Sequence, residues 1–394
     1  MTYDFDQVID RMKTDSIKWR FRKNADSIAL GWADMDFRTP DAVTEAVRRV
    51  ADFGLYGYVE PGPDWYDPFI DWCERRYGWK LEREWLSNAP GIIAALGCAV
   101  RAFTEKGDQV IFQTPGFALF TELTLTNGRE AVHNPLLYEN GRYAIDFADL
   151  EEKARNPRAK LLILCNPHNP TGRVFTRREL ECVADICLRN QVLIASDDVH
   201  CDMVYKPHRH ICIATLSEAA AMNSISCLSA SKTFNMAGLQ ISANVIPNPV
   251  LREKYARELV SRDSKRPNIF ALAAFHAAYR SGEPWLEDLL VYVKGNLDYL
   301  TEYIRANIPE IRVVQPEGTY LVWLDCSELG AARGLSGIAL SDFFADNANI
   351  FVSPGIGYGE EGANFIRLNL ACPRSVIAEA LCRMERAVKG QPGK

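Results

Sequence analysis

The sequence lacks most features that mark membrane, nucleic-acid-binding or disulfide-stabilised proteins. None of its apolar runs reaches the roughly 18 residues that a membrane-spanning helix needs. A net charge of −6 argues against a nucleic-acid partner, because phosphate binding needs a basic face. The eleven cysteines contain no CxxC pair, which favours free thiols in a reducing compartment. Residues 1–6 are acidic and unlike a secretory signal, so we expect a cytoplasmic protein with no membrane or nucleic-acid partner.

Common motifs for nucleotides and metals are missing or misplaced. There is no GxxxxGK[ST] phosphate loop and no HExxH metal motif. Residues 357–362 match GxGxxG, but a dinucleotide fingerprint must follow a strand and open a helix, and here a strand is predicted to follow it. Residues 208–212, HRHIC, fit a strand or loop as well as a metal site, and no second ligand pair stands nearby. We therefore expect no metal.

What the sequence does contain is an alternation of short apolar runs with amphipathic helical stretches. Apolar runs at 109–112, 160–164 and 192–195 read as strands. Between the last two lies a helical pattern over 177–190, which Thr176 can cap together with Glu179 three residues later. This rhythm predicts an α/β fold with a mostly parallel sheet covered by helices on both faces.

The chain is long enough for more than one domain. With 394 residues it exceeds an ordinary single domain. A nearly continuous helix is predicted over 261–303, with a break around 282–284, and the rest of the chain alternates short strands with helices. We predict an N-terminal segment, 1–44, that packs with a smaller C-terminal α+β domain, 281–394, and a large domain, 45–280.

Polar residues follow the predicted strands, where ligands gather in sheets of this kind. The loop 166–172, NPHNPTG, holds asparagine amides on a rigid turn, although a plain turn explains it equally well. Asp197 follows the next strand, and a buried carboxylate is costly unless it is paired or caps a helix. Gly91 could open a helix whose first amides bind phosphate.

Lys232 is the residue that connects these features. It lies in the run 229–234, SASKTF, after an apolar stretch. A desolvated lysine has a lowered pKa and becomes a nucleophilic amine that can form a Schiff base, and the nearby hydroxyls could hold a phosphate. Alone, such a lysine is more often a surface residue. Together with Asn169, Asp197 and His200, it suits pyridoxal phosphate (PLP).

These motifs resemble fold-type I PLP-dependent enzymes of the aminotransferase class I/II superfamily, and most of all the MalY/PatB-type cystathionine β-lyases, or C–S lyases. The matching segments cover nearly the whole chain, at 32–37, 56–58, 166–172, 196–202, 229–238 and 365–369. The resemblance implies a large domain with a mostly parallel sheet between helices, a smaller α+β domain, PLP as cofactor and a homodimer.

The resemblance also implies residue roles. Lys232 joins the cofactor covalently and moves the Cα proton of the substrate. Asp197 pairs with the ring nitrogen, and Asn169 and His200 bind the phenolic oxygen. Arg367 clamps the carboxylate of a small amino-acid substrate, with Ala33 and Asn169 beside it. The remaining cofactor contacts are the ring-stacking Phe117, the phosphate-binding Ile92, Ile93, Ser229 and Ser231, and Tyr58 from the second subunit.

Three positions depart from the family pattern. Phe117 stands where tyrosine is usual, Gly31-Trp32 stands where Trp-Val is common, and Asp198 replaces glutamate. The predicted function is a C–S β-lyase that cleaves cystathionine or related cysteine S-conjugates to a thiol, pyruvate and ammonia. An aminotransferase, or a biosynthetic PLP enzyme with altered chemistry, is the alternative. A ligand-sensing module of a transcription regulator is a third reading, but no basic domain precedes the motifs.

Overall fold

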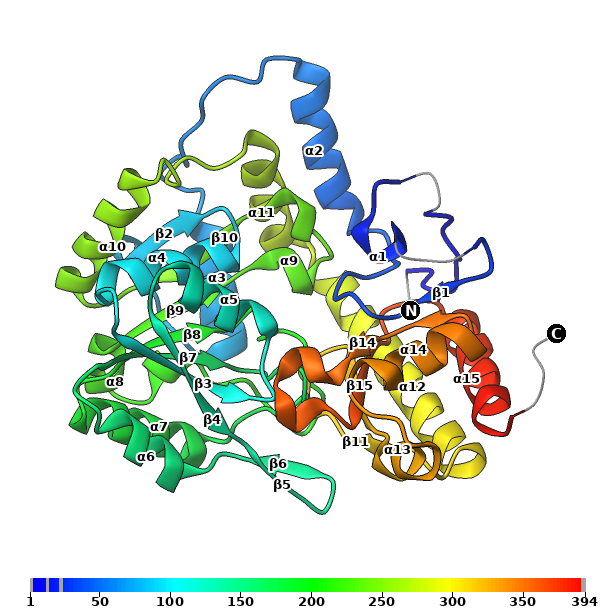
Figure 1. The fold of residues 1–394 in the computed structure, drawn as a ribbon. Coiled ribbons are helices and arrows are strands. Elements are labelled where there is room, and N and C mark those ends of the chain that lie inside the picture. The colour runs from blue at the N-terminus through cyan, green and yellow to red at the C-terminus, as the bar shows by residue number, and fades with distance from the viewer. Residues whose placement is uncertain (1–2, 12–13, 21–23, 391–394) are drawn as a thin grey trace.

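A seven-stranded sheet lies at the centre of the molecule (Figure 1). The structure, a computed structural model, describes residues 3–11, 14–20 and 24–390. Strand β10 is antiparallel to both of its neighbours, and the other six strands are parallel to one another. In spatial order the strands are β2 (Leu86–Ala89), β10 (Ser242–Val245), β9 (Ser224–Leu228), β8 (Leu193–Asp197), β7 (Ala159–Cys165), β3 (Gln109–Thr114) and β4 (Glu130–Pro135).

Both faces of this sheet are buried, which explains the continuous apolar runs of its strands. Ile111, Leu162 and Ile194 pack in one core with α6 (Phe147–Ala154) and α7 (Arg177–Arg189). The alternate residues, such as Val110 and Leu161, pack in a second core with α4 (Ile92–Phe103) and α10 (Pro249–Ser261). The predicted α/β class, with a mostly parallel sheet between helices, is confirmed.

Local signals set the start of the helices that matter for the site. The hydroxyl of Thr176 accepts a hydrogen bond from the amide of Glu179, whose carboxylate accepts one from the amide of Thr176, so α7 begins with a complete capping box. Helix α4 begins directly after Gly91, whose φ of 89° lies in the region that favours glycine.

The predicted continuous helix over 261–303 is wrong at its start. Helix α10 ends at Ser261, and residues 262–268 are not helical. Pro267 disfavours helical backbone in the residue before it, and the side chain of Asn268 accepts a hydrogen bond from the amide of Phe270 at 2.8 Å. Helix α11 (Ile269–Ser281) therefore starts afresh, and α12 (Glu283–Asn307) follows it.

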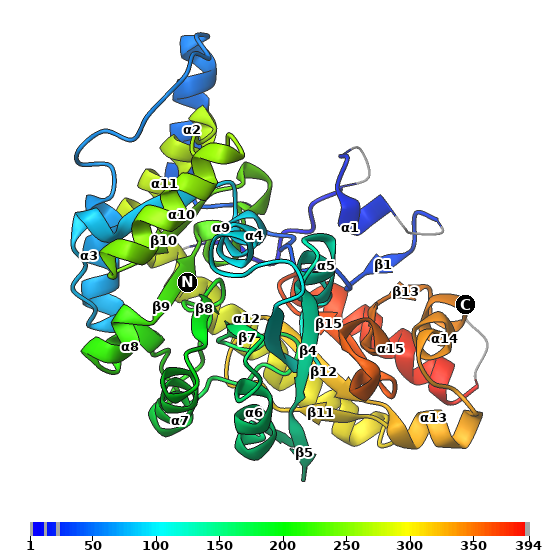
Figure 2. The same ribbon diagram turned by 60° about the vertical axis from the view of Figure 1, so that its left-hand side comes forward.

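The C-terminal elements and the N-terminal segment gather on one side of the central sheet (Figures 1 and 2). Ion pairs tie parts of the N-terminal segment together: Arg11 pairs with Asp34 at 2.9 Å and with Asp36 at 2.8 Å, and Lys18 pairs with Asp36 at 2.8 Å. The elements of this side are the antiparallel sheet β11 (Arg312–Val314), β12 (Leu321–Asp325), β15 (Phe365–Asn369) and β14 (Ser353–Pro354), the parallel pair β1 (Ile28–Ala29) and β13 (Ile350–Phe351), and helices α1 (Ile17–Arg20), α13 (Ser327–Arg333), α14 (Ile338–Asn347) and α15 (Arg374–Val388).

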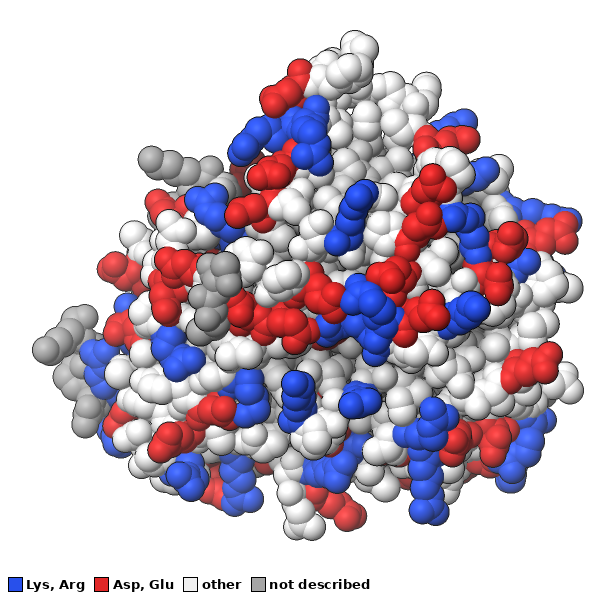
Figure 3. All heavy atoms as spheres, turned by 180° about the vertical axis from the view of Figure 1, so that it is seen from behind, with Lys and Arg blue, Asp and Glu red and all other residues white. Residues whose placement is uncertain are grey.

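The described residues form five further α-helices and a two-stranded hairpin. They are α2 (Asp41–Phe53), α3 (Asp67–Tyr77), α5 (Ala118–Thr126), α8 (Glu218–Met222), α9 (Ala230–Thr233) and the hairpin β5 (Leu137–Glu139) and β6 (Arg142–Ala144). Within the described residues, no helix combines the length and the apolar character needed to cross a membrane. On the face seen in Figure 3, acidic and basic side chains are intermixed rather than segregated.

Candidate active site

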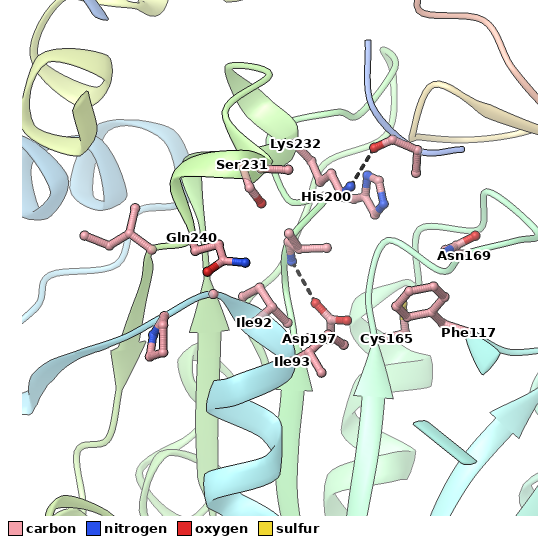
Figure 4. Close-up of a pocket in the computed structure, with 16 residues that line it drawn as sticks. Ile92, Ile93, Phe117, Cys165, Asn169, Asp197, His200, Ser231, Lys232 and Gln240 are labelled. Atoms are coloured by element: carbon pink, nitrogen blue, oxygen red, sulfur yellow. Dashed lines mark hydrogen bonds between the residues drawn. The ribbon is translucent and has the colours of Figure 1, made fainter. Parts of the chain in front are cut away.

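A cavity of about 250 Å³ lies where strands β7 and β8 end and helices α4 and α9 begin (Figure 4). Ligands of doubly wound sheets bind at such strand ends. The structure brings together nine residues predicted from the sequence. They are Ala33, Ile92, Ile93, Phe117, Asn169, Asp197, His200, Ser231 and Lys232.

Lys232 lies in the four-residue helix α9, and its side chain is partly buried where it lines the cavity. Burial lowers the pKa of its amine to about 8, because the charged form loses its hydration. Its Nζ donates a hydrogen bond to the backbone carbonyl of Ala33 at 2.5 Å (Figure 4). Roughly a tenth of such an amine is unprotonated at pH 7, far more than at the ordinary lysine pKa of 10.5, and the unprotonated form is the one that a nucleophile or proton acceptor requires.

Asp197 is the last residue of β8 and places a buried carboxylate beside the cavity. Burial raises the pKa of this carboxyl to about 7, although the amide of Val199 donates a hydrogen bond to its Oδ1 at 3.2 Å. Without a further cationic group, the charged form is poorly stabilised. Asp197 is thus suited to pair with a positive group bound in the cavity.

His200 and Arg367 carry unused hydrogen-bonding atoms. The Nδ1 of buried His200 has no partner among the described residues, and burial lowers the pKa of this imidazole well below its ordinary value. Arg367, on β15, donates from Nη1 to Oδ1 of Asn169 at 2.9 Å and from Nη2 to the carbonyl of Gly31 at 2.6 Å. Its Nε makes no hydrogen bond within the described part of the chain. Both side chains retain capacity for a polar ligand.

The N-terminus of α4 supplies the part of the cavity that suits a phosphate. Gly91, Ile92 and Ile93 line the cavity where the helix begins. The first amides of a helix have no partner within the helix and, with the helix dipole, attract anions. Ser231 lines the cavity near this helix end, as does Gln240, whose φ of 53° turns the chain after residues 237–239.

Three predicted site residues do not line the cavity within one subunit. Arg367 reaches it through its hydrogen bond to Asn169. The hydroxyl of Ser229 donates to the carbonyl of Ile241 at 2.7 Å and caps α9 by accepting from the amide of Ser231. Tyr58 is 95% exposed and lies outside the cavity. Their predicted contacts with the cofactor stay predictions.

Sequence reasoning missed several residues that shape the site. Tyr320 donates its hydroxyl to the carbonyl of Ala33 at 2.9 Å, the same oxygen that accepts from Lys232. Tyr320 and Ala33 are 287 positions apart in the sequence, so no local pattern links them. Gln240 and Cys165 also line the cavity without a motif of their own. Only Cys165 carried a signal in the sequence that could have placed it at the site, because it is the last residue of a predicted strand.

The two motifs that we rejected from the sequence fall outside the cavity. Residues 357–362 lie in two short 3₁₀ turns, and the next element is the strand β15, not a helix. His210 is buried, with its Nε2 3.4 Å from the carboxylate of Asp198. Across the described residues, no group of three or more His, Cys, Asp or Glu side chains could hold a metal ion.

Comparison with known proteins gives consistent matches over the whole chain. A model of the family "Aminotransferase class I and II" matches residues 25–384. Cystathionine β-lyase PatB of Bacillus subtilis (strain 168) is 39% identical, with 98% of this chain and all of PatB covered. Protein MalY of Escherichia coli (strain K12) is 31% identical, with 98% and 99% covered. Cystalysin from Treponema denticola, whose crystal structure contains pyridoxal 5'-phosphate, superposes with a TM-score of 0.94 at 32% identity, with 99% and 100% covered. The chain belongs to the aminotransferase class I and II family of fold-type I PLP-dependent enzymes and, within it, to the group of C–S lyases that includes PatB.

Proposed function

We propose that this protein is a PLP-dependent C–S β-lyase that cleaves cystathionine or a related cysteine S-conjugate to a thiol, pyruvate and ammonia. The observation that carries the proposal is the amine of Lys232, with its pKa lowered by its surroundings, in one cavity with the buried carboxylate of Asp197. The relatives support the choice of reaction, because PatB bears the name of a cystathionine β-lyase and matches along its entire length.

The residues of the cavity fit PLP. The start of α4 and Ser231 suit its phosphate, and Phe117 offers an apolar ring face for its pyridine ring. Asp197 supplies the negative partner for a protonated ring nitrogen, and the unpartnered Nδ1 of His200 suits the phenolic oxygen together with Asn169. When bound, the cofactor supplies an electron sink that lets the substrate's Cα lose a proton and its Cβ lose a thiolate.

The protein's own groups bind the substrate and move its protons. The guanidinium of Arg367, held by Asn169 and Gly31, binds the substrate carboxylate through charge-assisted hydrogen bonds. The amine of Lys232 then lies within the same cavity to accept the proton from Cα. The carbonyl of Ala33, which also lines the cavity, accepts a hydrogen bond from this amine and so orients it when it is free.

The direct test is to incubate the purified holoenzyme with L-cystathionine and measure thiol, pyruvate and ammonia. One water is consumed for each molecule cleaved, so the three products should form in equal amounts. A 2-oxo acid acceptor in a parallel reaction tests the aminotransferase alternative, for which the missing hydroxyl of Phe117 leaves room. Amino-group transfer to that acceptor without thiol release, over a panel of cysteine S-conjugates, would contradict the lyase proposal.

We also propose that the protein works as a homodimer in which Tyr58 reaches the partner's site. Large apolar side chains are exposed around the end of α2, with Phe53 at 74%, Leu55 at 67% and Tyr58 at 95%. Beside them lies a mostly apolar groove of about 560 Å³ between α2 and α11, lined by residues such as Val50 and Ile269. Exposed apolar surface of this kind marks a protein interface.

Mixing two defective subunits tests this arrangement. We expect Tyr58→Ala and Lys232→Ala each to lower activity when every subunit carries the same substitution. Equal co-expression should restore about a quarter of the wild-type rate, since half of the dimers are mixed and each mixed dimer has one intact site. In the control mixture, Lys232→Ala is co-expressed with Lys254→Ala, an exposed substitution on α10, in place of Tyr58→Ala. Recovery no greater than the sum of the two parents would show that Tyr58 acts within its own subunit.

A cytoplasmic location completes the proposal. All eleven cysteines are described, and all are free thiols, most of them buried. Proteins that fold in oxidising compartments commonly pair such residues, whereas the cytosol keeps them reduced.

A further inference from the structure

Behind the cavity lies a second buried carboxylate that the proposed reaction does not use, that of Asp202. Its side chain is fully buried, and it accepts hydrogen bonds from residues of two separate helices. The indole Nε1 of Trp72, on α3, donates to Oδ1 at 3.0 Å, and the hydroxyl of Tyr77, at the end of α3, donates to the same oxygen. The hydroxyl of Thr233, on α9, donates to Oδ2 at 2.8 Å.

The contact with Thr233 matters because Thr233 directly follows Lys232. Helix α9 has only four residues, and a single helical turn is not stable by itself. Successive helical side chains point about 100° apart, so the turn can present Lys232 to the cavity while Thr233 points to the carboxylate behind it. The cap by Ser229 holds the second residue of the turn, Ser231, and Asp202 holds its last residue, Thr233.

A cationic side chain, that of Arg76, compensates the negative charge of Asp202. The guanidinium of Arg76, on α3, lies 3.4 Å from Oδ1 of Asp202 and is only 19% exposed. It also pairs with Glu287 at 2.6 Å and Glu283 at 3.3 Å, both in the first turns of α12. Burial raises the pKa of the Asp202 carboxyl, and Arg76 and the hydrogen bonds oppose that rise. A buried carboxylate with this many donors is a rigid anchor.

We propose that Asp202 and Thr233 are a positioning pair that orients Lys232 toward the cofactor and the substrate's Cα. The inference rests on the proposed role of Lys232 but not on which reaction follows. A misdirected amine competes less well for the cofactor and accepts a proton more slowly, since small displacements of a reacting group lower its effective concentration steeply.

Thr233→Val tests the pair because it removes the hydroxyl and keeps the shape. In the holoenzyme, we expect hydroxylamine to displace the cofactor from Lys232 about tenfold faster than in wild type, as followed by cofactor absorbance. We also expect kcat to fall about tenfold with KM changed less than about threefold, and a larger isotope effect with substrate deuterated at Cα. Thr233→Ser, which keeps the hydroxyl, should recover most of both properties.

Two further variants make the outcome decisive. Thr124→Val removes another fully buried hydroxyl, whose one hydrogen bond within the described residues is to the carbonyl of Phe120 in its own helix, and should leave the hydroxylamine rate unchanged. Asp202→Asn tests the carboxylate itself, and Thr233→Val remains informative if that protein does not fold. Wild-type hydroxylamine rates and isotope effects in folded Thr233→Val would overturn the positioning pair. A covalent cofactor bond that survives in Lys232→Ala would instead overturn the assigned lysine, so the two failures are distinguishable.

Discussion

Lys232→Ala should abolish the covalent bond to PLP and lower kcat/KM at least about 10⁴-fold, because one side chain supplies both the nucleophile and the proton acceptor. Among the sixteen residues that line the cavity, no second lysine could replace it. Borohydride reduction followed by mass measurement checks the bond, since the reduced cofactor stays attached to the wild-type chain. Lys254→Ala, exposed on α10, is the matched control and should behave as wild type.

The lowered pKa of Lys232 gives this prediction a pH dependence. The amine reacts with the cofactor only when it is unprotonated, and its pKa is lowered to about 8 from the ordinary value of 10.5. The rate at which cofactor-free protein captures PLP should therefore rise with pH, reach half its maximum near pH 8 and level off about one pH unit above that. An amine of ordinary pKa would give a rate that still rises beyond pH 9. A capture rate that still rises beyond pH 9, or covalent capture of PLP by the Lys232→Ala protein, would contradict the role assigned to Lys232.

The parts of the site that the sequence predicted are those whose chemistry is local. Asn169 and Asp197 follow apolar strands within a few residues, so the strand pattern itself places them at one edge of the sheet. The start of α7 was predictable for the same reason, because its capping box joins residues only three positions apart. Local patterns of this kind need no knowledge of how distant segments pack.

The parts that were missed depend on contacts between distant segments. Tyr320 meets Ala33 across 287 positions, and Thr233 meets Asp202 only because α9 packs over the loop after β8. The helix prediction over 262–268 failed for a different reason. Its residues are compatible with a helix in isolation, but Pro267 and the capping side chain of Asn268 favour a new start at Ile269. The spacing of apolar residues alone does not show where a proline or a capping side chain ends one helix and starts the next.

Asp197→Asn should separate activity from stability. The substitution keeps the size of the side chain and can keep the hydrogen bond from the amide of Val199, but it removes the negative charge. A buried charge without its partner is costly, so the cofactor ring nitrogen should lose its proton and activity should fall about 10²- to 10³-fold. The measurements are the rate of pyruvate release and the affinity for PLP.

In the cofactor-free protein, Asp197→Asn should raise the stability of the fold, whereas it lowers the activity of the holoenzyme. The pKa of Asp197 is raised to about 7 in the folded chain, above its ordinary value of 3.8, so folding favours the neutral carboxyl. The stability that the neutral form contributes is fully present below about pH 4 and is lost as the pH rises through about 7. Asparagine stays neutral at every pH. Cofactor-free Asp197→Asn should therefore be more stable than wild type at pH 8, by on the order of 4 kcal/mol, with the difference shrinking toward pH 4.

Thermal unfolding of the two cofactor-free proteins at several pH values checks this sign. Asp185→Asn, an exposed substitution on α7, controls for the general effect of removing one negative charge. With PLP bound, the order should reverse, because the carboxylate of Asp197 then has a cationic partner and the asparagine does not. If Asp197→Asn were the less stable protein at pH 8 without cofactor, its charge would already be compensated within the chain. The carboxylate would then need no cationic ligand, and this would contradict its assigned pairing with the ring nitrogen of the cofactor.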